Sequence, residues 1–350
     1  AMTASTLEEF YECFRDYHSP AQNICVAENG PGGRVGQVII GHIPIRDGYT
    51  GAYPVDGADS SLQWTGYIPY DNLPHRLDPP EGFVAHANNI PRDTSNHDGP
   101  YLGSSFSSNH RVNRIIELLL AEAPLDAIDM QYMQLDDLDA SARTFVPHLL
   151  DAFDRSGEDF EDLVPYMEML REWDYCLSPD SISASVYQLW IIKLVQSCIL
   201  SNLPYSLRYY LSFEDRWLPI LDDYLSDRDV PSFIQGDDIP ARDRMVLTAL
   251  REAVLRLRSE AGPDESEWQW GQLNQAIFPH PSGQAAIIGG GAHPFGGGRY
   301  TVRVGHYSMS SALPFMNDFG AVFRSVVSSV DGRWSIQAVL CLLYTSDAAD

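Results

Sequence analysis

Two neighbouring asparagines and a downstream arginine stand out as polar residues that could act at one site. Asn88 and Asn89 are consecutive, and Arg111 lies 23 residues beyond Asn88. An amide side chain offers two N–H donors and an accepting oxygen, while a guanidinium stays charged and donates in fixed directions. Taken alone, the asparagine pair indicates a turn, because asparagine tolerates positive φ and caps helices. Arg111 alone fits a solvated side chain in the first turn of an amphipathic helix equally well.

The other groups that could do chemistry form no established motif. The glycine runs at 289–291 and 296–298 match neither G-x-x-x-x-G-K-[ST] nor G-x-G-x-x-G between a strand and a helix, so we expect plain flexible loops. There is no H-E-x-x-H or EF-hand loop and the ten histidines are scattered, which disfavours a transition-metal enzyme. A glycoside hydrolase would suit the seven Trp, 18 Tyr and 48 acidic residues, but no local carboxylate pair stands out, so this alternative ranks last.

Composition narrows the class of partner. The chain has 350 residues, 44% of them hydrophobic, which is enough for a sizeable core. Its 23 basic and 48 acidic residues give a net charge of −25, so nucleic acid and anionic membrane are disfavoured and a small molecule or peptide is expected. The longest apolar stretch, 186–200, is broken by polar residues, so no membrane span is predicted. The five cysteines include no C-x-x-C pair and are expected to be buried small apolar residues.

The elements that must position Asn88 and Arg111 follow from periodicity. A capping box at 6–9 opens a helix that we expect to reach residue 18, and 23–27 with 34–40 predict a β-hairpin. The Gly-, Pro- and Asp-rich stretch 41–100 is interpreted as a functional wrap. Between 109 and 260 the apolar residues recur at helical spacing in four stripes, and two further strands are predicted at 299–304 and 322–327.

The order β-rich, helical, β-rich predicts an α+β protein. We divide it into a β-rich part at 1–104, a helical block at 105–260, a β-rich return at 261–340 and a non-native tail at 341–350. The tail resembles a translated sequencing-adapter read-through.

A long gapped motif then gives a family resemblance. Residues 64–89 read WTGYIPYDNLPHRLDPPEGFVAHANN and resemble the signature W-x-G-x-I-P-F…N-P-P-x-G-x-I-x-x-x-N-N of the penicillin acylase (penicillin amidase) family of N-terminal nucleophile hydrolases. The resemblance runs from about Thr6 to Val339. Supporting motifs occur in the expected order: Ser19-Pro20-x-x-Asn23, Gly41-x-Ile43-Pro44-Ile45-Arg46, Arg111-x-x-Arg114-Ile115, Gln134-x-Asp136, Trp173-Asp174, Trp268-x-Trp270-Gly271 and His280-Pro281.

The resemblance implies a fold and a reaction. It implies part of an αββα sandwich with a large helical insertion, and hydrolysis of a linear amide such as an N-acyl side chain on a β-lactam nucleus, a homoserine lactone or a related amine. In the family an N-terminal Ser attacks, with its own α-amino group as general base. By position, Asn88 is expected to be the oxyanion donor and Arg111 to organise the site. Asn89 is the weaker candidate.

The departures from the family matter equally. No Ser-Asn-Asn-like nucleophile segment occurs, and Ser5 and Thr6 belong to the first helix cap. We therefore expect an internal fragment of the large (β) subunit, inactive alone, whose partners are an N-acyl amide substrate, the missing small subunit and the missing N-terminal part of the large subunit. A non-catalytic binding or structural homologue of the same fold is the alternative.

The family also suggests a metal and a compartment. It implies a structural calcium, and Asp98 is the nearest match to a ligand in this chain, although an ordinary Asp-Gly turn explains Asp98 as well. Trp173 and Asp174 are interpreted as a buried ring and a helix-terminating carboxylate, and His280 as structural. From the family alone we expect a periplasmic or secreted protein.

Overall fold

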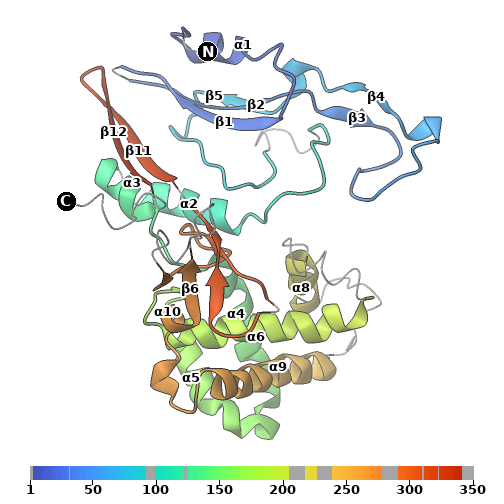
Figure 1. The fold of residues 1–350 in the computed structure, drawn as a ribbon, viewed down its shortest axis with the longest axis vertical. Helices are drawn as coiled ribbons and strands as arrows, with labels where there is room; N and C mark the ends of the chain where they lie inside the picture. The colour runs from blue at the N-terminus through green and yellow to red at the C-terminus, as the bar shows by residue number, and fades with distance from the viewer. Residues whose placement is uncertain are drawn as a thin grey trace. The chain divides into compact units, whose positions relative to one another are not determined.

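The computed structural model describes residues 3–30, 32–91, 99–121, 124–204, 217–226, 239–277, 291–309, 311–321 and 323–340. The chain divides into two compact units, and each is described by itself. The first unit comprises 1–127 and 326–337, and the second comprises 128–325 and 338–350. Figure 1 shows the strands between residues 22 and 77 of the first unit in blue and the helices of the second unit in green to orange. The four segments predicted from the sequence stay a prediction.

The first unit is built on the predicted hairpin. β1 (Gln22–Ala27) pairs antiparallel with β2 (Val35–Ile40), and β5 (His75–Leu77) pairs with the other edge of β2, so the sheet order is β1-β2-β5. β2 is therefore the central strand, and its side chains alternate between two small cores. Val38 and Ile40 lie in one core and Ile39 in the other. The hairpin prediction is confirmed.

Helix α1 (Leu7–Glu12) covers this sheet but is shorter than predicted. The Thr6 hydroxyl accepts from the Glu9 N–H at 3.1 Å, as the capping box predicts, while the Glu9 carboxylate accepts from the backbone N–H of Ser5 at 2.7 Å. The expectation that the helix reaches residue 18 is wrong. Beyond Cys13 the backbone N–H groups of Phe14, Arg15 and Tyr17 bond to carbonyls three residues back, and these tight turns end the helix.

The rest of the first unit consists of short elements that lead to the candidate site. β3 (Pro44–Arg46) pairs with β4 (Trp64–Tyr67), and single 3₁₀ turns lie at Ser60–Leu62 and Tyr70–Asn72. The helix that follows 99–109 is α2 (His110–Ala121).

β11 (Phe323–Val330) and β12 (Arg333–Leu340) form a hairpin, which confirms the strand predicted at 322–327 for its described residues.

The second unit is mainly helical, as predicted. The buried helix α6 (Ile182–Cys198) contacts α9 (Ile239–Glu260), which also contacts α4 (Ala140–Ser156). Among the described residues, the segment long and apolar enough to cross a bilayer is Ile182–Asn202, yet 72% of its apolar window is buried, as in a core helix. The other helices in the described part of this unit are α3 (Ala127–Met133), α5 (Val164–Arg171), α8 (Trp217–Leu225) and α10 (Trp270–Leu273), with 3₁₀ turns at Gly157–Leu163, Leu200–Asn202 and Glu265–Glu267.

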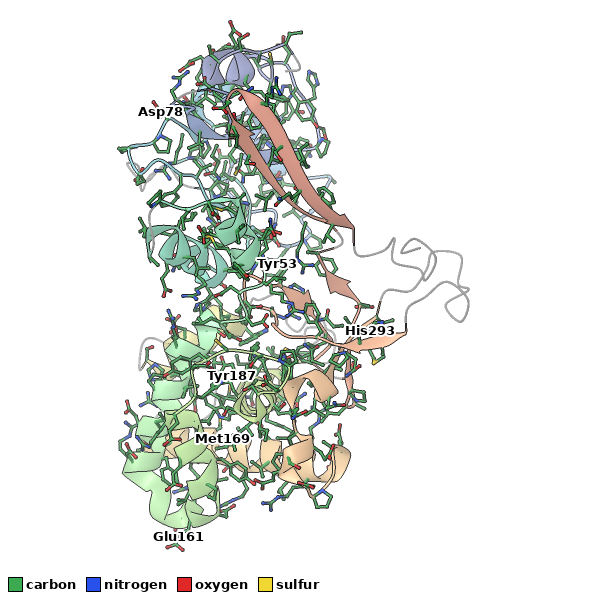
Figure 2. All side chains as sticks on the ribbon, turned by 90° about the vertical axis from the view of Figure 1, so that its left-hand side faces the viewer. Tyr53, Asp78, Glu161, Met169, Tyr187 and His293 are labelled. Carbon is green, nitrogen blue, oxygen red and sulfur yellow. The ribbon has the colours of Figure 1, made fainter. Side chains whose placement is uncertain are left out.

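A buried polar network fixes where α4 begins. The carboxylate of Asp139, which is fully buried, accepts from the backbone N–H groups of Ser141 and Ala142 at 2.9 and 3.3 Å, and so caps the helix. It also accepts from the Ser141 hydroxyl at 2.6 Å and the Gln188 amide at 3.0 Å. The hydroxyl of Tyr187 lies 2.9 Å from the Ser141 hydroxyl, and Tyr187 itself is 1% exposed. Figure 2 labels Tyr187 in the second unit. Burial raises the pKa of Asp139 despite these bonds.

The described residues of the second unit also form two small sheets. β6 (Asn274–Ile277) pairs antiparallel with β7 (Ala292–Pro294) and parallel with β9 (Phe315–Asn317), and β8 (Gly305–His306) pairs with β10 (Phe319–Gly320). The strand predicted at 299–304 is wrong. These residues turn, because the hydroxyl of Thr301 bonds to the backbone of Gly298 and Arg303 and replaces a strand partner. A single bridge joins Gly298 to Val304.

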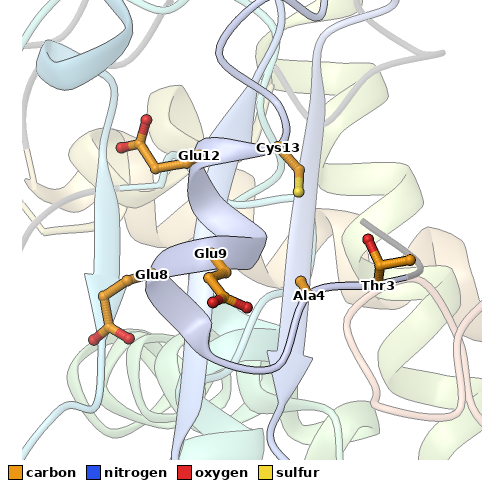
Figure 3. A pocket seen from close by; sticks show the side chains of 6 residues that line it. All are labelled: Thr3, Ala4, Glu8, Glu9, Glu12 and Cys13. Carbon is orange, nitrogen blue, oxygen red and sulfur yellow. The ribbon is translucent and has the colours of Figure 1, made fainter.

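The cysteines are less buried than expected. Cys198 is buried, but Cys176 is half-buried, and Cys13 and Cys25 are exposed. Cys341 lies outside the described residues. Cys13 lines an open hollow beside α1 together with Glu8, Glu9 and Glu12 (Figure 3). Glu8 pairs with Arg34 and Glu12 with Arg15, so two of these three carboxylates already have cationic partners.

The second glycine run is a packed turn, which corrects the expectation of a flexible loop. Gly296, Gly297 and Gly298 are all buried. Gly297 has φ +79°, and a Cβ built on it would overlap the backbone carbonyl oxygen of Arg303. Its own carbonyl accepts from the indole of Trp270 at 3.0 Å. Glycine is required here by positive φ and by the close approach of another backbone segment. Of the first run, Gly291 alone is described.

A matched pair of substitutions tests this requirement. Gly297→Ala should lower the free energy of unfolding by about 3 kcal/mol, combining the cost of positive φ with backbone overlap. Gly291 has a similar φ of +78° but no atom within 4 Å of a built Cβ, so Gly291→Ala should cost no more than about 1–2 kcal/mol. Urea unfolding followed by tryptophan fluorescence measures both changes. Equal losses in the two variants would show that packing at Gly297 is unimportant.

Candidate functional site

Asn88 lies in a turn of the first unit, in the backbone that leads from β5 towards α2. Its φ is +63°, a left-handed conformation that asparagine tolerates far better than most side chains, and the residue is exposed. Arg111 is the second residue of α2 and is half-buried. Asn88 therefore occupies a turn and Arg111 a first helical turn, as their sequence contexts predict.

The structure brings these two predicted site residues together. Nη2 of Arg111 lies 3.0 Å from Oδ1 of Asn88, and it also donates to the Ala87 carbonyl at 2.8 Å and the Ser107 hydroxyl at 3.3 Å. A guanidinium has donors only, so the oxygen of the Asn88 amide faces it. The Nδ2 group must then point away from Arg111. Within the described part of the chain, Asn88 Nδ2 donates to no protein group.

Backbone hydrogen bonds hold the turn around Asn88. The carbonyl of Asn88 accepts from the Ser107 N–H at 2.8 Å, which ties the turn to the segment preceding α2. The neighbouring amide of Asn89 is used locally: its Oδ1 accepts from the Ala87 N–H at 3.0 Å, and its Nδ2 donates to the Ile90 carbonyl at 3.2 Å. Asn89 therefore shapes the turn, while Asn88 keeps an amide donor for another molecule.

His86 also contacts this turn, and sequence reasoning missed it. Its Nδ1 accepts from the backbone N–H of Asn88 at 3.3 Å, and its Nε2 lies 3.1 Å from the carbonyl of Asn89. Burial lowers the pKa of His86, and the positive charge of Arg111 lowers it further. The position of His86 two residues before Asn88 was the available signal, but a histidine without a metal or catalytic motif gave no reason to select it.

The arrangement favours donation to an anion. The exposed Nδ2 amide group of Asn88 is oriented by Arg111. The guanidinium of Arg111 is itself held by three acceptors. A donor held in place before the ligand arrives needs no reorganisation, and the nearby positive charge adds to its attraction for a negative oxygen. The geometry therefore suits a developing oxyanion.

The remaining predicted residues lie elsewhere. Asp98 and His280 are outside the described residues. Trp173, 8% exposed, donates from its indole to the Cys176 carbonyl at 3.1 Å, and the Asp174 carboxylate accepts from the Cys176 N–H at 2.9 Å. Both therefore act within a turn of the second unit. In the described ranges, no three His, Cys, Asp or Glu side chains gather in a way that could hold a metal ion.

The chain is similar to known proteins over nearly its whole length. A family model described as penicillin amidase matches residues 1–341. An acyl-homoserine lactone acylase QuiP of Pseudomonas putida is 27% identical over 80% of this chain and 36% of its own length. A penicillin acylase 2 proenzyme of a Pseudomonas species is 24% identical over 98% of this chain and 47% of its own length.

A solved structure confirms the fold class. A thermostable penicillin G acylase from Alcaligenes faecalis superposes with a TM-score of 0.62 and 19% identity, over 76% of this chain and 51% of that chain. The predicted α+β fold of an N-terminal nucleophile hydrolase is thus confirmed. The chain spans between about a third and a half of the length of the two curated relatives described above. Because the family model matches 341 of the 350 residues, this chain belongs to the penicillin amidase family.

Proposed function

We propose that the protein hydrolyses linear amides, with Asn88 donating a hydrogen bond to the oxyanion of the tetrahedral intermediate. The observation that carries the proposal is the exposed amide of Asn88, oriented by Arg111 at 3.0 Å. In this role Nδ2 donates to the former carbonyl oxygen of the substrate as negative charge forms on it. Arg111 is a positioning residue, because it acts through Asn88.

The nucleophile is proposed to lie in the part of the relatives' length that this chain does not span. It would be an N-terminal Ser whose α-amino group takes the hydroxyl proton as the oxygen attacks the amide carbon. The amine then leaves, and water releases the acyl group from the Ser oxygen. The small subunit and the preceding part of the large subunit are the proposed protein partners.

The substrate class is proposed from the chemistry and from the relatives. Two relatives are named as acylases of acyl-homoserine lactone and of penicillin. We therefore propose an N-acyl small molecule, with a homoserine lactone or a β-lactam nucleus as the amine. A periplasmic or secreted location is proposed with it.

A structural calcium ion is a further part of this proposal. Carboxylate and carbonyl oxygens are the ligands that Ca²⁺ prefers, and Asp98 is the ligand proposed from this chain. The described residues contribute no metal cluster of their own. No step of the proposed reaction uses the ion.

The chain of 350 residues should not hydrolyse amides by itself, because it supplies an oxyanion donor without the proposed nucleophile and base. A chromogenic acyl-anilide measures this directly. Turnover by the purified chain that disappears on mutation of one of its serines would contradict the assignment of the nucleophile to another segment.

In the full-length protein, Asn88→Gly should lower kcat by on the order of a hundredfold to a thousandfold, the usual effect of losing one oxyanion donor. Glycine adopts the φ of +63° without strain, so this variant removes the amide while the turn is kept. Asn88→Ala should lower kcat at least as much. Near wild-type turnover of Asn88→Gly would favour the non-catalytic alternative or another donor.

Arg111→Lys should lower kcat by about 10- to 100-fold, because the hydrogen bond that orients Asn88 is lost although the charge remains. A matched control is Arg15→Lys, which weakens the exposed ion pairs of Arg15 with Glu12 and Asp71 in the same unit. The control should retain full kcat. If both variants behave alike, Arg111 has no special effect on Asn88.

A further inference from the structure

His86 contacts the backbone on both sides of the Asn88–Asn89 pair, at the N–H of Asn88 and the carbonyl of Asn89. A backbone N–H can only donate, so Nδ1 of His86, which lies 3.3 Å from the Asn88 nitrogen, must carry no proton. A carbonyl can only accept, so Nε2, 3.1 Å from the Asn89 oxygen, must carry one. The two contacts together select a single state of the ring, the neutral imidazole protonated on Nε2.

We propose that His86 is a positioning residue that holds Asn88 in its donor conformation only while its imidazole is neutral, so that low pH releases the turn. The inference rests on the proposed role of Asn88 as an oxyanion donor. It adds His86 as a second residue that positions Asn88, and it makes the conformation of Asn88 dependent on pH.

Protonation would oppose the turn in two ways. A proton on Nδ1 would face the N–H of Asn88, so that two donors meet and one hydrogen bond is lost. The ring would also become a cation close to Arg111 of α2, which is the charged side chain that acts on it among the described residues. Both effects disfavour the charged ring, and the half-buried position of His86 adds a desolvation cost.

The direction of the pH effect follows. Burial, the largest cause, holds the pKa of His86 below its ordinary value near 6.5; the hydrogen bond to the Asn89 carbonyl acts in the opposite direction, and the charge of Arg111 lowers the pKa again. The folded turn therefore prefers the neutral ring, and its stabilisation is complete above pH 6.5. It decreases as the pH falls from 6.5 through the pKa of the folded state, because the unfolded turn binds the proton more readily.

The test uses the 350-residue chain and needs no activity. NMR spectra of the chain labelled with ¹⁵N-histidine report the tautomer and the pKa of His86. Hydrogen exchange reports how strongly the backbone N–H of Asn88 is protected. We expect an Nε2–H tautomer at pH 7.5 and a pKa below 6.5. At pH values below the pKa found in this titration, the hydrogen-exchange protection of the Asn88 backbone amide should fall by about tenfold, corresponding to about one lost hydrogen bond. The proposal would be overturned by a ring that is protonated on Nδ1 at pH 7.5. It would also be overturned if the hydrogen-exchange protection of the Asn88 backbone amide did not change with pH.

Two variants separate positioning from general folding. His86→Asn places a non-titrating amide oxygen where it can accept from the Asn88 N–H, so Asn88 protection should become independent of pH. His293→Asn is the control, since His293 is exposed on β7 of the second unit (Figure 2) and should leave the pH response unchanged. Loss of the response in both variants would contradict the assignment to His86.

The activity readout then distinguishes this inference from the proposed function. In the full-length enzyme, kcat should fall below pH 6.5, and part of this fall should be absent in His86→Asn; the α-amino base accounts for the part that remains. If Asn88→Gly keeps full activity while the magnetic resonance results hold, the oxyanion role fails and the link between His86 and the turn stands. If Asn88→Gly is inactive but the ring titration is absent, the inference about His86 fails alone.

Discussion

The hydrogen bond from Arg111 to Oδ1 of Asn88 is the constraint on which the candidate site depends. It decides which end of the amide faces the protein and therefore which end faces solvent. The other features of the site support this bond. Ser107 ties the turn to the segment before α2, and the left-handed backbone of Asn88 brings its side chain within reach of the guanidinium. The proposed chemistry thus depends on the Asn88 amide, whose direction is set by the Arg111 guanidinium.

The parts of the fold governed by short-range rules could be predicted from sequence. The hairpin of β1 and β2 follows from alternation around a glycine-rich loop, and the helices of the second unit follow from apolar stripes. The two site residues could be selected because a long motif and a fixed spacing carry family information. Their contact at 3.0 Å depends on how a turn and a helix meet, which no local pattern encodes.

The errors arise where residue type and spacing do not determine the contacts that a residue makes or how exposed it is. Residues 299–304 have strand-like composition, yet the hydroxyl of Thr301 bonds to nearby backbone and bends the chain. Cys13 and Cys25 are apolar by type but lie on the surface. His86 gave no motif, because its importance lies in two backbone contacts that only the folded turn creates.

The buried glycine turn has a consequence for how this sequence can drift. Every change at the first or second base of a glycine codon introduces a different residue or a stop codon. At Gly296, Gly297 and Gly298 a Cβ would meet the Asp137 side chain, the Arg303 backbone and the Leu177 side chain, respectively. The three codons together therefore form a short stretch of nine bases in which most mutations damage the fold. Divergent copies of the gene should keep this triplet for as long as selection maintains a folded product, whatever becomes of their substrates.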